Sequence, residues 1–233
     1  MHDIFHVHTY RCGHAEDVPD ELYIKKAIEI GADRITFTDH APFPGNIFYN
    51  RMRYEQLPEY VNTLRQLKRK YEEQIIVRIG LETEYLPSFR SYYQELAEML
   101  DLLMIGQHFF EAAPGKYSFS LSNQEEIEYP GCLDAMMQGM ESGLFQVAAH
   151  PDRIFRHIKN WNQNCEKGSK DLISLAKNKE VILEKNLSSM RHRNYFREEF
   201  WQLLMPENKT IFGLDAHAVS DLEHVQQLAG NKK

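Results

Sequence analysis

Nine potential metal ligands are spread along almost the whole chain, and each follows a short β-branched or hydrophobic run. They comprise seven histidines and two carboxylates: His6, His8, His14, His40, Glu82, His108, His150, Asp215 and His217. Core strands usually exclude unpaired polar groups, so this many at strand ends are hard to obtain by accident. Because a mononuclear site needs only three or four protein ligands, nine predict a site with several metal ions.

Strand-like runs alternate with helical patterns throughout the sequence. The predicted strands lie near 3–7, 33–38, 75–81, 101–106, 145–149, 180–185 and 210–214. The predicted helices lie near 19–30, 54–73, 88–99, 131–142, 168–178, 195–204 and 219–229. In the clearest helix, Leu57, Tyr60, Val61 and Leu64 follow the three-or-four spacing of a buried face. About seven β/α units of this kind predict an α/β fold with a parallel sheet, open or closed.

The position of the ligands favours a closed sheet. In a closed barrel the C-terminal ends of the strands meet at one rim, where ligands from many strands converge. An open doubly wound sheet concentrates its site on two or three strands and usually carries a Gly-rich phosphate loop. The chain has neither a G-x-G-x-x-G motif nor a P-loop. We therefore expect a seven-unit barrel with its metal site at the C-terminal rim.

Composition narrows the class of protein further. The 233 residues include 42% hydrophobic residues and no Pro/Gly/Ser-rich linker, which predicts a single domain over residues 1–233. A net charge of -7 gives no overall attraction for nucleic acid or an anionic membrane, and no apolar run is long enough to span a bilayer. Three cysteines without a Cys-x-x-Cys pair, and no secretory segment, favour the cytoplasm. The predicted helices have no extra apolar face that indicates an oligomeric state.

Two pairs of ligands are spaced for a strand. His6 and His8 lie two residues apart, which places both on one face of an extended strand, where they can reach one metal. Glu82 and Glu84 also share a face, and we favour Glu82 because it is nearer the expected strand end. Cys12 is expected to pack in its loop rather than to act as a thiolate ligand or nucleophile.

Seven short motifs link these ligands to a known family. They are HVHT from His6 with CGHA from Cys12, FTDHAPFP from Phe37, GLETEY from Gly80, IGQH ending at His108, AHPD from Ala149, and DAH from Asp215. A chain with these motifs resembles the PHP (polymerase and histidinol phosphatase) superfamily over almost its full length, and within it the histidinol-phosphatase branch. The resemblance implies a distorted (β/α)7 barrel with a trinuclear metal centre.

The resemblance also implies how the ligands are shared. The three implied groups are His6, His8, Glu82 and Asp215 for one metal; Glu82, His108 and His150 for a second; and His14, His40 and His217 for a third. Glu82 is then a bridging carboxylate. Sites rich in imidazole with some carboxylate accept zinc, iron and manganese, so we expect three divalent ions of these kinds.

The charge of such a centre suits a phosphate ester. Three divalent ions bring about +6, against about -2 from Glu82 and Asp215, so a phosphate dianion fits the rim. A water shared by two metals would have its pKa lowered toward about 7, giving a bridging hydroxide that attacks phosphorus. The resemblance implies hydrolysis of L-histidinol phosphate, a step of histidine biosynthesis, with Glu82, Asp215 and His217 as catalytic residues.

Four further residues are predicted to bind the substrate. Arg153 and Arg191 follow predicted strands, and as rim-loop residues they can clamp phosphate oxygens with bidentate bonds. His192 is expected to contact phosphate or to protonate the leaving group, unless it is a solvated loop residue. Asp39 beside His40 either orients a ligand histidine or anchors a cationic amine of the substrate.

Two departures from the family leave alternatives open. Leu214 stands where the family often has serine before the final Asp-x-His, and residues 184–191 only loosely match the family's Glu-x-Asn segment and loop arginine. Another small phosphomonoester is therefore an alternative substrate. A nuclease or phosphodiesterase would need a basic groove, which this acidic chain does not indicate. A non-catalytic metal-binding barrel would be expected to have lost some ligands.

Overall fold

The structure is a computed structural model that describes residues 3–122, 124–192 and 195–224. Its main sheet has the strand order β1-β2-β3-β4-β7-β8-β9. These strands are β1 (Asp3–Val7), β2 (Arg34–His40), β3 (Ile76–Thr83), β4 (Leu102–Ile105), β7 (Val147–Ala148), β8 (Ile182–Asn186) and β9 (Thr210–Gly213). All seven predicted strands are confirmed, each within two residues at either end.

Among the described residues, internal contacts divide the chain into two compact units. The first unit consists of residues 3–82, 100–102 and 213–224, and the second of residues 83–99 and 103–212. The sequence-based assignment of one domain over residues 1–233 stays a prediction.

In the first unit, β1, β2 and β3 form consecutive parallel pairs, with Ile35 opposite Ile4 on one side and Val77 on the other. The chain after β9 continues along the other edge of β1. The Leu214 N–H donates to the Phe5 carbonyl at 2.8 Å, and an isolated parallel bridge joins Val7 to Ala216. Strand β1 therefore has a backbone neighbour on each side.

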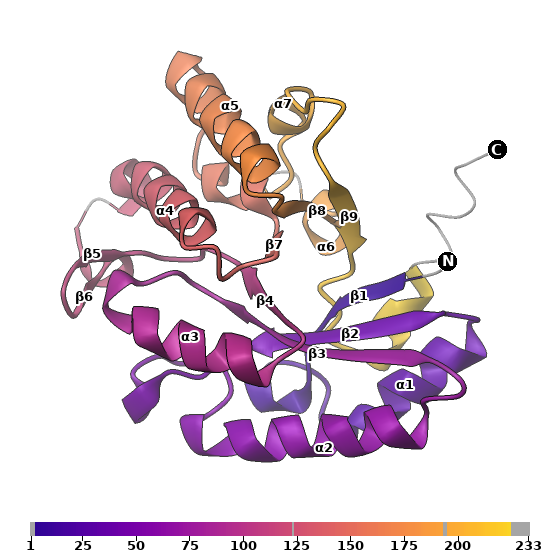
Figure 1. Ribbon diagram of the computed structural model, residues 1–233. Helices are drawn as coiled ribbons and strands as arrows, with labels where there is room; N and C mark the ends of the chain where they lie inside the picture. The colour runs from indigo at the N-terminus through magenta and orange to yellow at the C-terminus, as the bar shows by residue number, and fades with distance from the viewer. Residues whose placement is uncertain (1–2, 123, 193–194, 225–233) are drawn as a thin grey trace. The chain divides into compact units, whose positions relative to one another are not determined.

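Helices α1 (Asp20–Glu29) and α2 (Leu57–Lys70) cover one side of these strands (Figure 1). The apolar stripe predicted for α2 is buried. The first turn of α2 contains a proline, which has no backbone N–H, at a position where an N–H would find no partner within the helix. The Tyr60 hydroxyl donates to the Gly80 carbonyl at 2.9 Å, and Lys68 pairs with Asp101 at 2.8 Å. Four 3-10 helices complete this unit: Tyr10–Cys12, Pro44–Asn46, Tyr54–Gln56 and Val219–His224.

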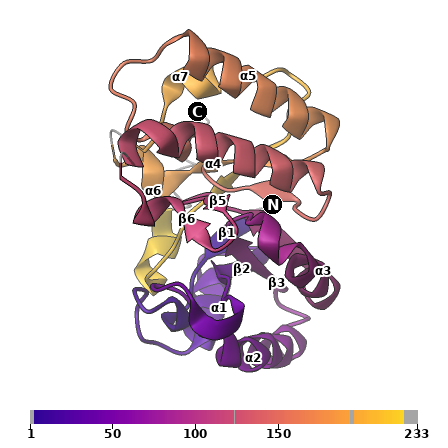
Figure 2. The ribbon, with the colours of Figure 1, turned by 90° about the vertical axis from the view of Figure 1, so that its left-hand side faces the viewer.

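The described part of the second unit contains β7, β8, all of β4 but Leu102 and all of β9 but Gly213, together with five helices. They are α3 (Arg90–Met99), α4 (Gln124–Glu141), α5 (Gln163–Asn178), α6 (Leu187–Met190) and α7 (Glu198–Trp201). Figure 2 shows α4 and α5 packed side by side. The remaining elements are a two-stranded hairpin of β5 (Glu111–Ala113) and β6 (Lys116–Tyr117), and 3-10 helices at Pro87–Phe89, Ser118–Ser120 and Pro151–Phe155.

Several predicted helix bounds were wrong. Helix α5 starts five residues before the predicted 168, because the Asn162 side chain accepts hydrogen bonds from two backbone N–H groups and caps it there. Helix α4 starts before Pro130 rather than after it. The predicted helix 195–204 shortens to α7, since buried Asp152 accepts from the Arg197 N–H and from the Trp201 indole.

The last predicted helix, 219–229, is a 3-10 helix over Val219–His224, and 225–229 lie outside the described residues. The segment between the predicted strand near 101–106 and the predicted helix near 131–142 contains the β5–β6 hairpin, which the alternation pattern did not indicate. No helix in the described part of the chain is long and apolar enough to cross a bilayer.

A close approach at Gly80 gives the first prediction. A Cβ on Gly80 would lie 2.8 Å from the Leu102 side chain and 2.9 Å from its carbonyl oxygen. Overpacking against backbone typically costs 1–3 kcal/mol, so we expect Gly80→Ala to lower the free energy of unfolding by about 2 kcal/mol in urea denaturation. Gln66→Ala, on the exposed face of α2, should change it by less than about 0.5 kcal/mol. Equal denaturation midpoints for the two variants would contradict this packing.

Candidate metal centre

The imidazoles of His6 and His8 converge in the first unit. Both side chains are fully buried, and their Nε2 atoms lie 3.0 Å apart. Asp215 Oδ1 lies 3.2 Å from His8 Nε2 and 3.7 Å from His6 Nε2. The ligand atoms of these three side chains are close enough to share one metal ion.

The backbone reaches this arrangement through unusual conformations. The β1–β2 register shifts between Phe5 and Val7, so His6 lies in a bulge, with φ of 69°. Asp215 also has a left-handed φ, of 54°. The expectation that His6 and His8 follow simple strand alternation was therefore wrong, although both rings do meet. Non-glycine residues in this region cost free energy and cluster at functional sites.

Further ligands of the first unit surround this pair. His14 Nε2 and His217 Nε2 lie 3.0 Å apart, and His40 is close enough to complete a three-histidine group. His40 and Glu82 are paired in register at the ends of β2 and β3. Glu82 Oε2 lies 3.2 Å from His40 Nδ1 and 3.3 Å from His6 Nε2. One carboxylate therefore reaches histidines from two strands.

Divalent metals fit these donor sets. Ring nitrogens of His6 and His8 at 3.0 Å face each other with at most one proton between them, which suits atoms that share a cation. Imidazoles with a few carboxylates are the ligand set of zinc, iron and manganese. Cys12 is also near His8 and His217, but burial and the charge of Asp39 raise the pKa of its thiol to about 12. This agrees with its expected packing role.

Charges inside the cluster are strongly coupled. Burial opposes protonation of His8, yet the carboxylates of Asp215 and Asp39, which lie 3.2 and 3.6 Å from its ring nitrogens, raise its pKa to about 9. Burial also opposes ionisation of Asp215, but the His6 charge and the His8 hydrogen bond hold its pKa well below its usual range. Burial and the charge of His8 lower the pKa of His217 to about 4. A metal ion that binds here would displace the proton of His8.

The second unit holds the other two predicted histidines. The rings of His108 and His150 have centroids 5.1 Å apart. Buried Glu84 lies with Oε1 3.0 Å from His108 Nδ1, and the His150 N–H donates to Glu184 Oε2 at 2.9 Å. His150 has a left-handed φ of 31°. From the sequence, Glu84 was only an alternative to Glu82 as a metal ligand. In the structure, Glu84 lies beside the His108 ring, where its carboxylate can orient that histidine.

Comparison with known proteins identifies the family. The model of the PHP domain matches residues 5–201. The chain belongs to the PHP domain family.

Two relatives align with this PHP domain over much of their length. A probable histidinol-phosphatase of Deinococcus radiodurans is 32% identical over 164 residues, or 66% of this chain and 62% of that protein. The chain thus spans less than two thirds of that relative's length. A histidinol-phosphatase of Bacillus subtilis is 24% identical, and the alignment covers 95% of this chain and 96% of that protein.

A solved structure confirms the fold class. The histidinol phosphate phosphatase of Lactococcus lactis, complexed with zinc, L-histidinol and phosphate, superposes with a TM-score of 0.71 at 19% identity. The match covers 98% of this chain and 92% of that one. Together with the order of the seven strands, this agrees with the predicted distorted (β/α)7 barrel.

The four predicted substrate-binding residues lie in different settings. Asp39 is fully buried with its carboxylate toward Thr9 and His8, which favours its orienting role. Arg153 is partly buried, with its guanidinium carbon 4.7 Å from the centre of the Tyr195 ring. Arg191 and His192 are exposed.

Metal content tests the cluster. His40 belongs to two of the ligand groups of the first unit, whereas His157 is 44% exposed and pairs with Glu128. We expect His40→Ala to lower the number of metal ions bound per chain after reconstitution, because it removes a ligand atom from both groups. His157→Ala should bind as many ions as the unchanged protein. Elemental analysis after gel filtration measures both, and equal content in the two variants would refute the ligand assignment.

Proposed function

We propose that the protein is a metal-dependent phosphoric monoester hydrolase that converts L-histidinol phosphate to L-histidinol and phosphate. The observation that carries this proposal is the convergence of seven predicted ligands in the first unit: His6, His8, His14, His40, Glu82, Asp215 and His217. Membership of the PHP family and two relatives that bear the histidinol-phosphatase name support the substrate. The Lactococcus structure, which contains zinc, L-histidinol and phosphate, supports a small phosphorylated metabolite as the partner.

We infer a centre of three divalent ions, with zinc, iron and manganese as candidates. The groups His6–His8–Asp215 and His14–His40–His217 would hold two of them. Glu82 would serve the first of these and, with His108 and His150, a third ion, as the family resemblance implies. Bound ions would supply a water of lowered pKa and positive charge for the phosphate oxygens.

The protein's own side chains then fix ligands and exclude water. Burial of His6, His8 and Glu82 keeps the centre in a low-dielectric setting, where its charges act strongly on a bound phosphate. Arg153, which is stacked on Tyr195, would donate to phosphate oxygens.

We infer a cytoplasmic location for the protein, because its three cysteines are all buried and none forms a disulfide.

Phosphate release tests the activity. The substrates are L-histidinol phosphate, p-nitrophenyl phosphate and a nucleotide monophosphate, each with protein reconstituted in Zn²⁺, Mn²⁺ or Fe²⁺. A preference of several hundredfold in kcat/KM for histidinol phosphate, or roughly 3 to 4 kcal/mol of discrimination, is the expected result. If all three substrates are hydrolysed at comparable, slow rates, the natural substrate is another phosphomonoester. No release from fully metallated protein would overturn it.

Removal of the shared carboxylate should abolish turnover. Glu82 reaches His6, His8 and His40, so Glu82→Ala removes the carboxylate that faces all three histidines. We expect phosphate release to fall to background and metal content to drop in the same preparation. Normal activity in this variant would refute the assignment of Glu82.

The role proposed for Arg153 has a distinct kinetic signature. Arg153→Ala should raise KM for the phosphomonoester by roughly ten- to a hundredfold, since a charge-assisted hydrogen bond contributes about 1.5–3 kcal/mol. Metal content should stay unchanged. Arg90→Ala, an exposed arginine at the start of α3, is the matched control and should leave KM as it is. If KM is unchanged in Arg153→Ala, Arg153 does not bind phosphate and only packs on Tyr195.

A further inference from the structure

We propose that Arg11 is a positioning residue of the metal centre, which acts on the ligand His8 through Thr9 and Asp39. This inference rests on the metal-binding role proposed above for His8. Arg11 lies in the 3-10 helix Tyr10–Cys12, between the ligands His8 and His14, and it belongs to none of the motifs that indicated the site.

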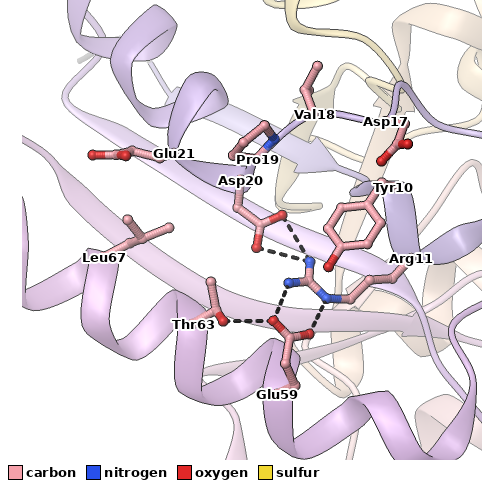
Figure 3. Close-up of a pocket in the computed structure, with 10 residues that line it drawn as sticks. All are labelled: Tyr10, Arg11, Asp17, Val18, Pro19, Asp20, Glu21, Glu59, Thr63 and Leu67. Carbon is pink, nitrogen blue, oxygen red and sulfur yellow. Dashed lines mark hydrogen bonds and ion pairs between the residues drawn. The ribbon is translucent and has the colours of Figure 1, made fainter.

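Two carboxylates hold the Arg11 guanidinium from opposite sides (Figure 3). Its Nη1 donates to both oxygens of Asp20 at 2.9 Å, and its Nε and Nη2 donate to the two oxygens of Glu59 at 2.8 and 2.9 Å. Asp20 opens α1 and Glu59 lies in the first turn of α2. The Arg11 side chain is 1% exposed. A planar fork fixed this way has a single orientation, which lysine cannot reproduce.

From this clamp, a chain of polar contacts runs to the metal ligand. Arg11 Nη1 also donates to Thr9 Oγ1 at 3.1 Å, and the Thr9 hydroxyl donates to Asp39 Oδ2. The other oxygen of Asp39 accepts from the His40 N–H at 2.8 Å and lies 3.6 Å from His8 Nδ1. All the links lie inside the first unit. The Asp39 carboxylate is therefore fixed by donors at both oxygens while it faces His8.

This arrangement suits the orientation of a ligand. A histidine that binds metal through one ring nitrogen usually presents the other to a carboxylate, and loss of such an outer partner costs about 10–100-fold in metal affinity or activity. The Nε2 atom of His8 faces the other ligands of the cluster, and its Nδ1 atom faces Asp39. Arg11 determines which way the Thr9 hydroxyl points, because its N–H occupies the Thr9 oxygen and leaves the hydroxyl proton for Asp39.

Zinc affinity in a double-mutant cycle tests this path. Thr9→Val cuts the path and leaves the clamp on Asp20 and Glu59 in place, and Arg11→Lys retains the charge without the fork. Each is measured by competition with a chromogenic chelator, beside the double variant. We expect each single variant to bind zinc about tenfold more weakly. The double variant should be no weaker than the worse single one, because both changes break the same path.

Arg34→Ala is the matched control for loss of an ion-paired arginine in the same unit. Arg34 pairs with Asp3 at 3.1 Å at the start of β2. The Arg34→Ala variant should bind zinc as tightly as the unchanged protein, even if its melting temperature is lower. Additive losses in the cycle, or a loss in Arg34→Ala as large as in Arg11→Lys, would overturn the proposal. If the unchanged protein itself binds no zinc, it is the proposed function that fails.

The pocket beside Arg11 gives a second test that does not depend on the cycle. Arg11, Asp20 and Glu59 line a cavity of about 570 Å³, together with Tyr10, Thr63 and Leu67 (Figure 3). In Arg11→Ala, methylguanidinium at millimolar concentration can enter this pocket and pair with both carboxylates. We expect it to restore zinc affinity severalfold in Arg11→Ala and not in Thr9→Val. If methylguanidinium restores the melting temperature of Arg11→Ala but not its zinc affinity, Arg11 contributes only to the stability of the fold and the proposal fails.

Discussion

The structure of the first unit depends on the burial of imidazoles and carboxylates that face one another. Burial of isolated polar or charged groups is costly unless they are paired or bind a metal. His6, His8 and Glu82 are each at most 1% exposed, and His6 Nε2 lies 3.0 Å from His8 Nε2 and 3.3 Å from Glu82 Oε2. The bulge at His6 and the left-handed backbone of Asp215 serve this convergence, because regular strands would aim the two residues elsewhere.

The same constraint explains the polar groups behind the cluster. Asp39 and Arg11 are also buried, and each makes hydrogen bonds to protein groups rather than to solvent. A half-satisfied buried network destabilises a core, whereas a complete one fixes its geometry. The second unit follows the same design on its own ligands, since Glu84 faces the His108 ring and Glu184 accepts the His150 N–H. Each unit thus arranges its histidines with its own carboxylates.

Much of the fold could be predicted from the sequence, because hydrophobic runs and ligand positions are local signals. All seven strands and the apolar face of α2 were readable from residue spacing. Contacts distant in the chain were not. Asp152 shortens the helix at α7 by accepting from Arg197, 45 residues away, and Arg11 meets Glu59 at a separation of 48 residues. No periodicity in the sequence encodes such partners.

The ligands were predictable as residues but not as geometry. The spacing of His6 and His8 indicated one face of a strand, and the two rings do meet, yet they meet through a bulge. Local propensity cannot foresee a bulge whose conformation is favoured only once both rings share a site. The same holds for Glu84. The sequence placed it on the same strand face as Glu82 and favoured Glu82 as nearer the strand end. The fold gives each a different partner: Glu82 faces the histidines of β1 and β2, and Glu84 faces His108.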